Sequence, residues 1–192
     1  MTIATSTIIK TKYGRFKVCY HEFKNESCLS FSKGNLTRIN TIVRIHSACL
    51  FGEVFQSLHC DCYIQLKKAI DLIRKNKNGV IIYSYQEGRG IGLKNKIKSM
   101  EISRKKNIDT VDAFIELGFT KPDYRSYQVE INALKELNIN KKIRLLSGNP
   151  LKIRTLKKAG YEIENILENV QGLNKLAKNG RRAKIKKLGY KY

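Results

Sequence analysis

The chain has 192 residues, and its 38 lysines and arginines against 16 aspartates and glutamates give a formal net charge of +22. Hydrophobic residues make up 42% of the sequence, which is normal for a soluble globular protein, and no apolar run approaches the roughly 20 residues that a membrane-spanning helix needs. We therefore expect a soluble globular protein that attracts polyanions, either nucleic acid or a nucleotide triphosphate, unless the charge is only a solvated lysine-rich surface. The N-terminus lacks a secretory signal, which favours a cytoplasmic location.

The first half of the sequence predicts strands, a helix and another strand. Residues 12–56 mix short apolar runs with turn residues, which is typical of several strands. Residues 65–76 carry apolar side chains at helical spacing, with lysines opposite. A buried strand is expected over residues 79–85, and the glycine-rich turn 86–92 leads into a basic helix over about 93–105.

The second half alternates helices and strands. Asp109 or Thr110 could cap a helix over 111–117, and Asn149 followed by Pro150 is typical of a helix start. The other expected elements are a helix over 127–137, a strand over 142–146, a strand over 161–167, and a basic helix or loose tail in the last 20 residues. Early mixed strands followed by this alternation predict a single compact domain of the α/β (mixed α+β) class.

Three of the five cysteines, Cys49, Cys60 and Cys62, form the pattern Cys-x10-Cys-x-Cys. An odd number of cysteines does not indicate a disulfide framework, and clustered cysteines in a reducing compartment bind metal or take part in chemistry. Three thiolates could hold a zinc ion and leave its fourth position to water, which points to hydrolysis. The alternative is three unrelated buried cysteines, as we expect for Cys19 and Cys28.

Cys60 and Cys62 could face one ion either from an extended segment or from a tight turn. Three thiolates make the site anionic and weaken the metal as a Lewis acid, so we expect a base or a cation nearby. Either His46 or His59 could be a fourth ligand, which would close the site and make it structural; otherwise these histidines orient substrate or merely pack.

Three further loops could bind or transform an anionic substrate. In the turn 86–92, Arg89 offers a forked phosphate donor and Glu87 an acceptor, although the glycine spacing matches neither common nucleotide-binding motif. Asp123 and Arg125 could supply a base and a phosphate clamp, or merely a surface salt pair. Residues 147–152 join a strand to a helix, which either binds an anion or is only a capped helix.

Taken together, these segments resemble the GTP cyclohydrolase II family. The resemblance rests on Arg44-Ile-His-Ser-x-Cys49, Ser57-Leu-His-Cys-Asp-Cys62, Gln65-Leu66, Gln86-Glu-Gly-Arg-Gly-Ile-Gly-Leu-x-Asn-Lys96, Asp109-Thr-Val111, Leu117-Gly-Phe119 and Asn149-Pro150. It implies an N-terminal extension over 1–10, a catalytic domain over 11–168 and a basic C-terminal helix or tail over 169–192. The implied reaction opens the GTP imidazole ring, releases formate and pyrophosphate, and begins riboflavin biosynthesis with a diaminopyrimidine ribosyl phosphate.

The resemblance also implies roles by position. Cys49, Cys60 and Cys62 would hold one zinc ion per subunit, which would activate the water that attacks purine C8. Asp123 would be the proton acceptor and Arg125 the nucleophile toward the α-phosphate, although a guanidinium is better suited to stabilising phosphoryl charge. Mg²⁺ would accompany the triphosphate, and the family is typically homodimeric. The residues expected to line the GTP site are Arg44, Ile45, His46, Ser47, Ala48, Gln65, Glu87, Gly88, Arg89, Thr110, Ser147 and Lys152.

The sequence departs from the family pattern at several positions. Ala48 stands where the family usually has glutamate, Met100 where it usually has tyrosine, and Ser147-Gly148 where it usually has Thr-Asn. These departures leave open a homologous hydrolase with a different product or pathway, for example in secondary metabolism. A third hypothesis, from another class, is a zinc-containing protein without catalysis whose positive charge binds nucleic acid nonspecifically.

Overall fold

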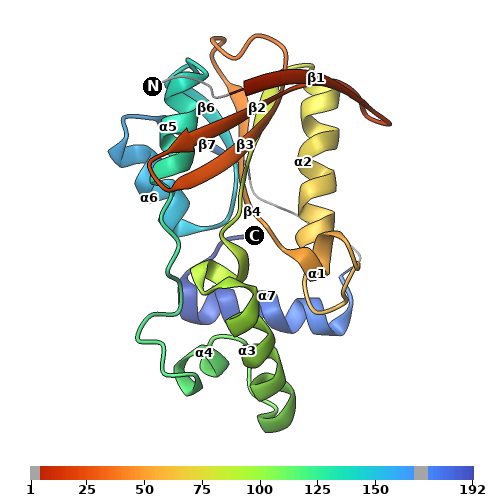
Figure 1. Cartoon of the computed structure of the whole chain (residues 1–192), viewed down its shortest axis with the longest axis vertical. Helices are drawn as coiled ribbons and strands as arrows, with labels where there is room; N and C mark the ends of the chain where they lie inside the picture. The colour runs from red at the N-terminus through yellow and green to blue at the C-terminus, as the bar shows by residue number, and fades with distance from the viewer. Residues whose placement is uncertain (1–4, 167–172) are drawn as a thin grey trace.

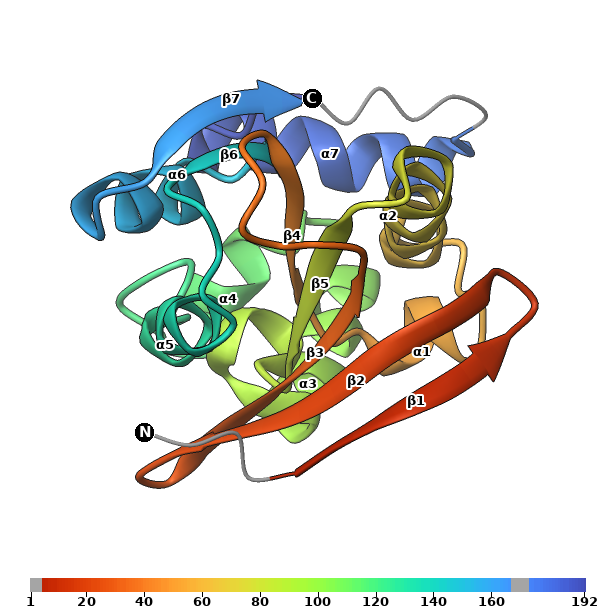
Figure 2. The same ribbon diagram turned by 90° about the horizontal axis from the view of Figure 1, so that it is seen from above.

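The computed structural model describes residues 5–166 and 173–192. Within these ranges, the strands form one seven-stranded mixed sheet in the order β1-β2-β3-β5-β4-β6-β7 (Figures 1 and 2). Antiparallel pairing joins β1 (Thr5–Thr11), β2 (Gly14–Phe23), β3 (Glu26–Lys33) and β5 (Gly79–Ser84). Parallel pairing joins β5, β4 (Thr41–Ser47), β6 (Lys142–Leu146) and β7 (Glu162–Ile166). The predicted mixed α/β class is therefore confirmed.

The sheet has a hydrophobic core on each face, because successive residues of a strand point to opposite sides. Val43 and Ile45 pack in the core that includes residues of α5 (Gln128–Glu136) and α6 (Pro150–Lys158). Ile42 packs on the opposite face, in the core that includes residues of α2 (Cys62–Asn76). Figure 2 shows α5 and α6 on one side of the sheet and α2 on the other.

The expected helices are present, with shifts at their ends. The helix α2 begins three residues earlier than the apolar spacing indicated, and α3 (Gly92–Lys106), α4 (Asp112–Glu116), α5 and α6 lie where they were predicted. The N-cap of α4 is Val111, which makes no side-chain cap, but the Oδ1 of Asp109 just before it accepts hydrogen bonds from the backbone of Val111 and Asp112. The last 20 residues were expected to form a basic helix or a loose tail, and most of them form the helix α7 (Lys175–Leu188).

One expected strand region contains a helix. Residues 12–56 were predicted as strands, but Leu50–Glu53 form the short helix α1. A helix of four residues is too short to show the 3.6-residue periodicity on which a helix prediction depends.

The ends of the described ranges bear on two expectations. Of the expected N-terminal extension, residues 1–4 lie outside the described residues, whereas Thr5–Thr11 form the edge strand β1. The strand expected over 161–167 is β7, and Leu167 lies outside the described residues. None of the helices in residues 5–166 and 173–192 has the length and apolar character that crossing a bilayer requires.

Candidate active site

The candidate site lies at the carboxyl ends of the parallel strands. Cys49 follows the end of β4 at Ser47, the glycine-rich turn follows β5, and Ser147 follows β6. Because parallel strands end at the same edge of a sheet, loops that are distant in sequence meet there. This edge is where open α/β sheets usually bind ligands.

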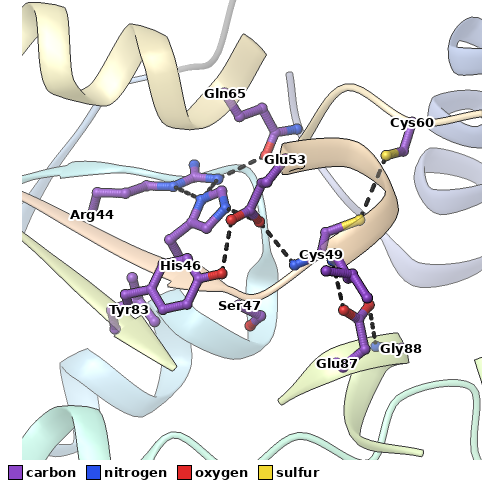
Figure 3. A network of polar contacts seen from close by, with 12 residues as sticks. Arg44, His46, Ser47, Cys49, Glu53, Cys60, Gln65, Tyr83, Glu87 and Gly88 are labelled. Carbon is purple, nitrogen blue, oxygen red and sulfur yellow. Dashed lines mark hydrogen bonds and ion pairs between the residues drawn. The ribbon is translucent and has the colours of Figure 1, made fainter. Parts of the chain in front are cut away.

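The three cysteines of the predicted metal site come together. Their sulfur atoms all lie within 4.8 Å of one another, and the sulfurs of Cys49 and Cys60 are 3.7 Å apart (Figure 3). Two thiolates at about 2.3 Å from a tetrahedral zinc ion would be about 3.8 Å apart, so the cluster fits this metal. Cys62 is the first residue of α2 and Asp61 its N-cap, which favours the tight turn over the extended segment.

Gly52 makes room for this cluster. A Cβ atom at Gly52 would lie 2.6 Å from the sulfur of Cys60 and 3.2 Å from that of Cys49. Both distances are well inside van der Waals contact, so a side chain at this position would push the sulfurs apart. Sequence reasoning missed this residue, because one glycine in a short helix has no periodic or motif signal.

The cluster has the cation that its negative charge requires. The Nζ atom of Lys96 lies 3.2 Å from the sulfur of Cys49 and 2.6 Å from Oε1 of Glu87. Hydrogen bonds with Cys60 and Cys62 lower the pKa of Cys49, and the charge of Lys96 acts in the same direction. The same sulfur contacts raise the pKa of Cys60 and of Cys62. The nearby ammonium of Lys96 therefore favours the thiolate form of Cys49.

Histidine does not complete the cluster, since the only such metal-ligand group in the described part of the chain contains the three cysteines alone. The ring of His46 is already engaged: Nδ1 faces Arg44 at 3.3 Å, and Nε2 donates to Glu53 at 3.0 Å. Burial lowers the pKa of His46 to about 4 despite the hydrogen bond to Glu53, so the ring is neutral. His59 is exposed in the loop before Cys60.

Hydrogen bonds of Glu53 hold the loop that carries Cys49 in place. Besides His46, its carboxylate accepts hydrogen bonds of 2.8 Å from the backbone nitrogen of Cys49 and from the hydroxyl of Tyr83 (Figure 3). One largely buried carboxylate, with its side chain 10% exposed, thus joins β4, β5 and α1. Sequence reasoning missed Glu53 as well, because its partners come from three different elements.

Asp123 and Arg125 do not form a surface salt pair, because their side chains are only 13% and 9% exposed. Arg125 binds both carboxylate oxygens of Asp123, at 2.9 and 2.5 Å, and its Nη1 contacts the hydroxyl of Ser47 at 3.3 Å. Burial alone raises the pKa of Asp123, but the hydrogen bonds and charge of Arg125 outweigh it and hold that pKa below its ordinary value. The pair is therefore ionised.

Three further cations gather around this pair. Arg44 donates to the carbonyl oxygen of Leu146 at 3.0 Å and to Gln65 at 2.7 Å, and burial lowers its pKa to about 10. Lys152 donates to the carbonyl oxygen of Ile45 at 2.8 Å. Burial, with the charges of Arg44 and then Arg125, holds the pKa of Lys152 well below its ordinary value.

Arg89 is the fourth cation, and its partners are neutral. Its Nη2 donates to the carbonyl oxygen of Thr110 at 2.6 Å, and its guanidinium lies 3.9 Å from the ring centre of Phe114. The Nη1 atom is buried and has no hydrogen-bond partner among the described residues. Burial and the nearby charge of Arg125 lower the pKa of Arg89 to about 10. Such a group is suited to an anionic ligand.

The glycine-rich turn brings Arg89 against the loop of the Asp123/Arg125 pair. Gly88, Arg89 and Gly90 have φ angles of 62°, 58° and 90°, a left-handed conformation that favours glycine. A Cβ atom at Gly90 would lie 2.9 Å from the backbone of Tyr124, and the Tyr124 amide donates to the Arg89 carbonyl at 2.9 Å. The glycines therefore permit a close approach of two loops.

Some expected site residues contribute backbone rather than side chain. The side chain of Ile45 is fully buried in the core, and Ala48 donates its amide to Ser84. By contrast, Ser147 uses its side chain: its hydroxyl accepts a hydrogen bond of 3.1 Å from the backbone amide of Asn149, which in turn caps α6. Tyr190 near the C-terminus, which sequence reasoning did not connect with the site, contacts both Arg125 and Asn149.

Residues 2–168 match the protein family described as GTP cyclohydrolase II. The chain is 43% identical over 162 residues to a GTP cyclohydrolase-2 of Archaeoglobus fulgidus, covering 84% of this chain and 42% of that protein. It is 42% identical over 158 residues to the riboflavin biosynthesis protein RibBA of Endomicrobium trichonymphae, covering 81% and 38%. It is 38% identical over 187 residues to a GTP cyclohydrolase-2 of Haemophilus influenzae, covering 95% and 85%. The chain thus spans less than half of the first two relatives and most of the third.

Proposed function

Because the chain belongs to the GTP cyclohydrolase II family, we propose that it opens the imidazole ring of GTP and releases formate and pyrophosphate. The product is a diaminopyrimidine ribosyl phosphate, and the reaction is the first step of riboflavin biosynthesis. One observation carries this proposal: a three-thiol cluster and four cationic side chains converge at one edge of the sheet. Only one residue separates Ser47, which contacts Arg125, from Cys49.

In this proposal Cys49, Cys60 and Cys62 hold one zinc ion per subunit. Zinc in such a site lowers the pKa of a bound water and supplies a nucleophile at neutral pH. Lys96 offsets the negative charge of the thiolates, and its contact with Glu87 links the cluster to the glycine-rich turn. Gln65 and Glu87 offer polar groups to the guanine base or the ribose, and Mg²⁺ accompanies the triphosphate.

Arg44, Arg89, Arg125 and Lys152 bind the triphosphate, whose negative charges offset the cost of burying cations next to one another. A phosphate oxygen at Arg125 competes with Asp123 for the same guanidinium. As Arg125 turns toward phosphate, the pKa of Asp123 rises toward its ordinary value, because its main stabilising partner is withdrawn. Asp123 then accepts a proton more readily, and Arg125 stabilises the developing phosphoryl charge.

The direct test uses protein loaded with zinc and magnesium and incubated with GTP. Formate, pyrophosphate and the pyrimidine product should appear in equal amounts, and a zinc chelator should stop all three. Absence of turnover under these conditions would contradict the proposal. Formate without pyrophosphate, or pyrophosphate without formate, would favour the second candidate described below.

The second candidate is a homologous hydrolase with a different product or pathway. It is favoured by Ala48 and Met100, which stand where the family usually has glutamate and tyrosine. The double substitution Ala48→Glu and Met100→Tyr distinguishes the two. A faster release of the same products would mean that these positions only tune the reaction, and an unchanged or lower rate would contradict that view.

We also propose that the protein is a cytoplasmic homodimer. The thiols of Cys19 and Cys28 are free, as expected in a reducing compartment. Val54, Phe55 and Leu58 in the loop after α1 are 64%, 68% and 63% exposed, which suits burial against a second copy. Phe55→Lys should reduce the mass measured by light scattering to that of one chain.

The positive charge also supports nonspecific nucleic-acid contact, whose affinity should fall steeply with salt.

A further inference from the structure

The chain after α7 returns to the candidate site. Gly189 has a φ angle of 67°, which ends the helix and turns the chain back, and residues 189–192 then form what we call the C-terminal strap. The hydroxyl oxygen of Tyr190 accepts two hydrogen bonds of 2.8 Å, from Nη2 of Arg125 and from the side-chain amide of Asn149. Figure 1 shows α7 below the sheet and the C-terminus near the lower ends of β4 and β5 in this view.

Several contacts besides those of Tyr190 hold the strap in place. The amide of Lys191 donates to the carbonyl oxygen of Gly148 at 2.9 Å. The ring of Tyr192 stacks on that of Tyr190 with centres 5.8 Å apart, and the guanidinium of Arg181 lies 4.1 Å from the ring centre of Tyr192. The strap is therefore packed against the site.

Gly148 permits this packing. A Cβ atom at Gly148 would lie 1.6 Å from the carbonyl oxygen of Lys191, and the three nearest heavy atoms all belong to Lys191. The strap can occupy its place only because residue 148 has no side chain. The closed position of the strap therefore depends on Gly148, which leaves space for Lys191, and on Tyr190, which contacts Arg125.

The position of the Tyr190 oxygen suits an anion. It accepts hydrogen bonds from a guanidinium and from an amide, as an oxygen of a phosphate group would. A charged oxygen would form stronger hydrogen bonds with Arg125 than a phenol oxygen does. Lys152 and Arg89 nearby donate to neutral carbonyl oxygens, so they too can gain from an anion at this edge.

We propose that the C-terminal strap competes with the triphosphate of the substrate, because the Tyr190 hydroxyl occupies the place of a phosphate oxygen on Arg125 and Asn149. The inference rests on the proposed function, which supplies the triphosphate. The strap must open before the anion binds, so the apparent dissociation constant is the intrinsic one divided by the fraction of open molecules. Weakening the strap therefore strengthens binding of the anion.

The test measures binding of inorganic triphosphate, which lacks the ring that is opened, by calorimetry with zinc-loaded protein. Tyr190→Phe removes one hydroxyl and should lower the dissociation constant about threefold to tenfold, the scale of one or two lost hydrogen bonds. Tyr161→Phe is the matched control, because its hydroxyl has no hydrogen-bond partner among the described residues. It should leave the dissociation constant unchanged.

Gly148→Ala tests the same strap from the opposite side. The three atoms nearest to the new methyl group all belong to Lys191, so the substitution should open the strap and lower the dissociation constant, as Tyr190→Phe does. Equal or weaker binding of triphosphate by both variants overturns the proposal, as does the absence of any binding by wild type and variants. Tighter binding without formate release from GTP would support the strap and contradict the proposed function.

Movement of the strap can be measured by fluorescence, and a strap with a purely structural role would leave this signal unchanged. The chain contains no tryptophan, so Tyr192→Trp introduces one fluorophore into the strap. Saturating triphosphate should shift its emission to longer wavelength, because the ring leaves its stacked position for water. An unchanged emission spectrum at saturation would overturn the proposal.

Discussion

The cysteine cluster and the cationic cluster share one edge of the sheet but are assembled in opposite ways. The three cysteines lie within residues 49–62, and the geometry of one turn and two helix starts brings them together. The cations come from residues 44, 89, 125 and 152, each on a different segment, and the strap at residue 190 lies farther still along the chain. The cysteine cluster therefore depends on the packing of one short segment. The cationic cluster depends on the whole fold, so it changes when any of its segments moves.

The largest expected effect comes from removing a ligand of the cysteine cluster. Cys60→Ala should reduce the zinc content from one per chain to nearly none and slow formate release by more than about a thousandfold, as when an essential group of a catalytic unit is removed. Elemental analysis and a formate assay measure both. Cys19→Ala, at a buried cysteine of β2, is the control and should keep its zinc. Full zinc occupancy in Cys60→Ala would show that the cluster is not the metal site.

Arg125→Lys tests the cationic cluster. The ammonium keeps the charge but loses the fork that contacts Asp123, Ser47 and Tyr190. We expect kcat/KM for GTP to fall about a hundredfold to a thousandfold, the scale of losing one preorganised donor. Arg144→Lys, in the more exposed pair with Glu164, is the matched control and should have no such effect. A rate within twofold of wild type would mean that the forked geometry is not needed.

The buried ring of His46 predicts how stability depends on pH. Its pKa is about 4 in the folded protein against an ordinary value of 6.5, so the unfolded chain binds more protons between these values. The free energy of unfolding should therefore fall as the pH is lowered from 7 to 4, by about 3 kcal/mol from this group. Denaturation at several pH values measures it. His46→Gln should show a smaller fall than wild type, and an equal fall in both would contradict the assignment.

The smallest expected effect concerns space in the cysteine cluster. Gly52→Ala places a methyl group 2.6 Å from the sulfur of Cys60, so zinc affinity should fall about tenfold even though every ligand is kept. Competition with a chelating dye measures the affinity. Gly180→Ala in α7 is the matched control, because its nearest atom would be 3.6 Å away. If both variants bound zinc equally well, the cluster would tolerate more expansion than its packing indicates.

Most of the fold could be predicted from the sequence, because its elements carry local patterns. The strand β6 coincides with its predicted range, and Asn149 and Pro150 mark the start of α6 through capping chemistry that is readable in two residues. The helix α1 could not be predicted, since four residues are too few for a period. Pairing of β1 with β2 adds an edge strand where an extension was expected.

The sequence by itself determined the candidate metal ligands and the family, because the cysteine spacing and the neighbouring motifs are read within short segments. Tertiary structure decided what surrounds those ligands. The space at Gly52, the contact of Lys96 with Cys49 and the hydroxyl of Tyr190 on Arg125 all join side chains that no sequence pattern relates. They depend on which strand ends share an edge of the sheet, and long-range packing rather than local propensity decides this.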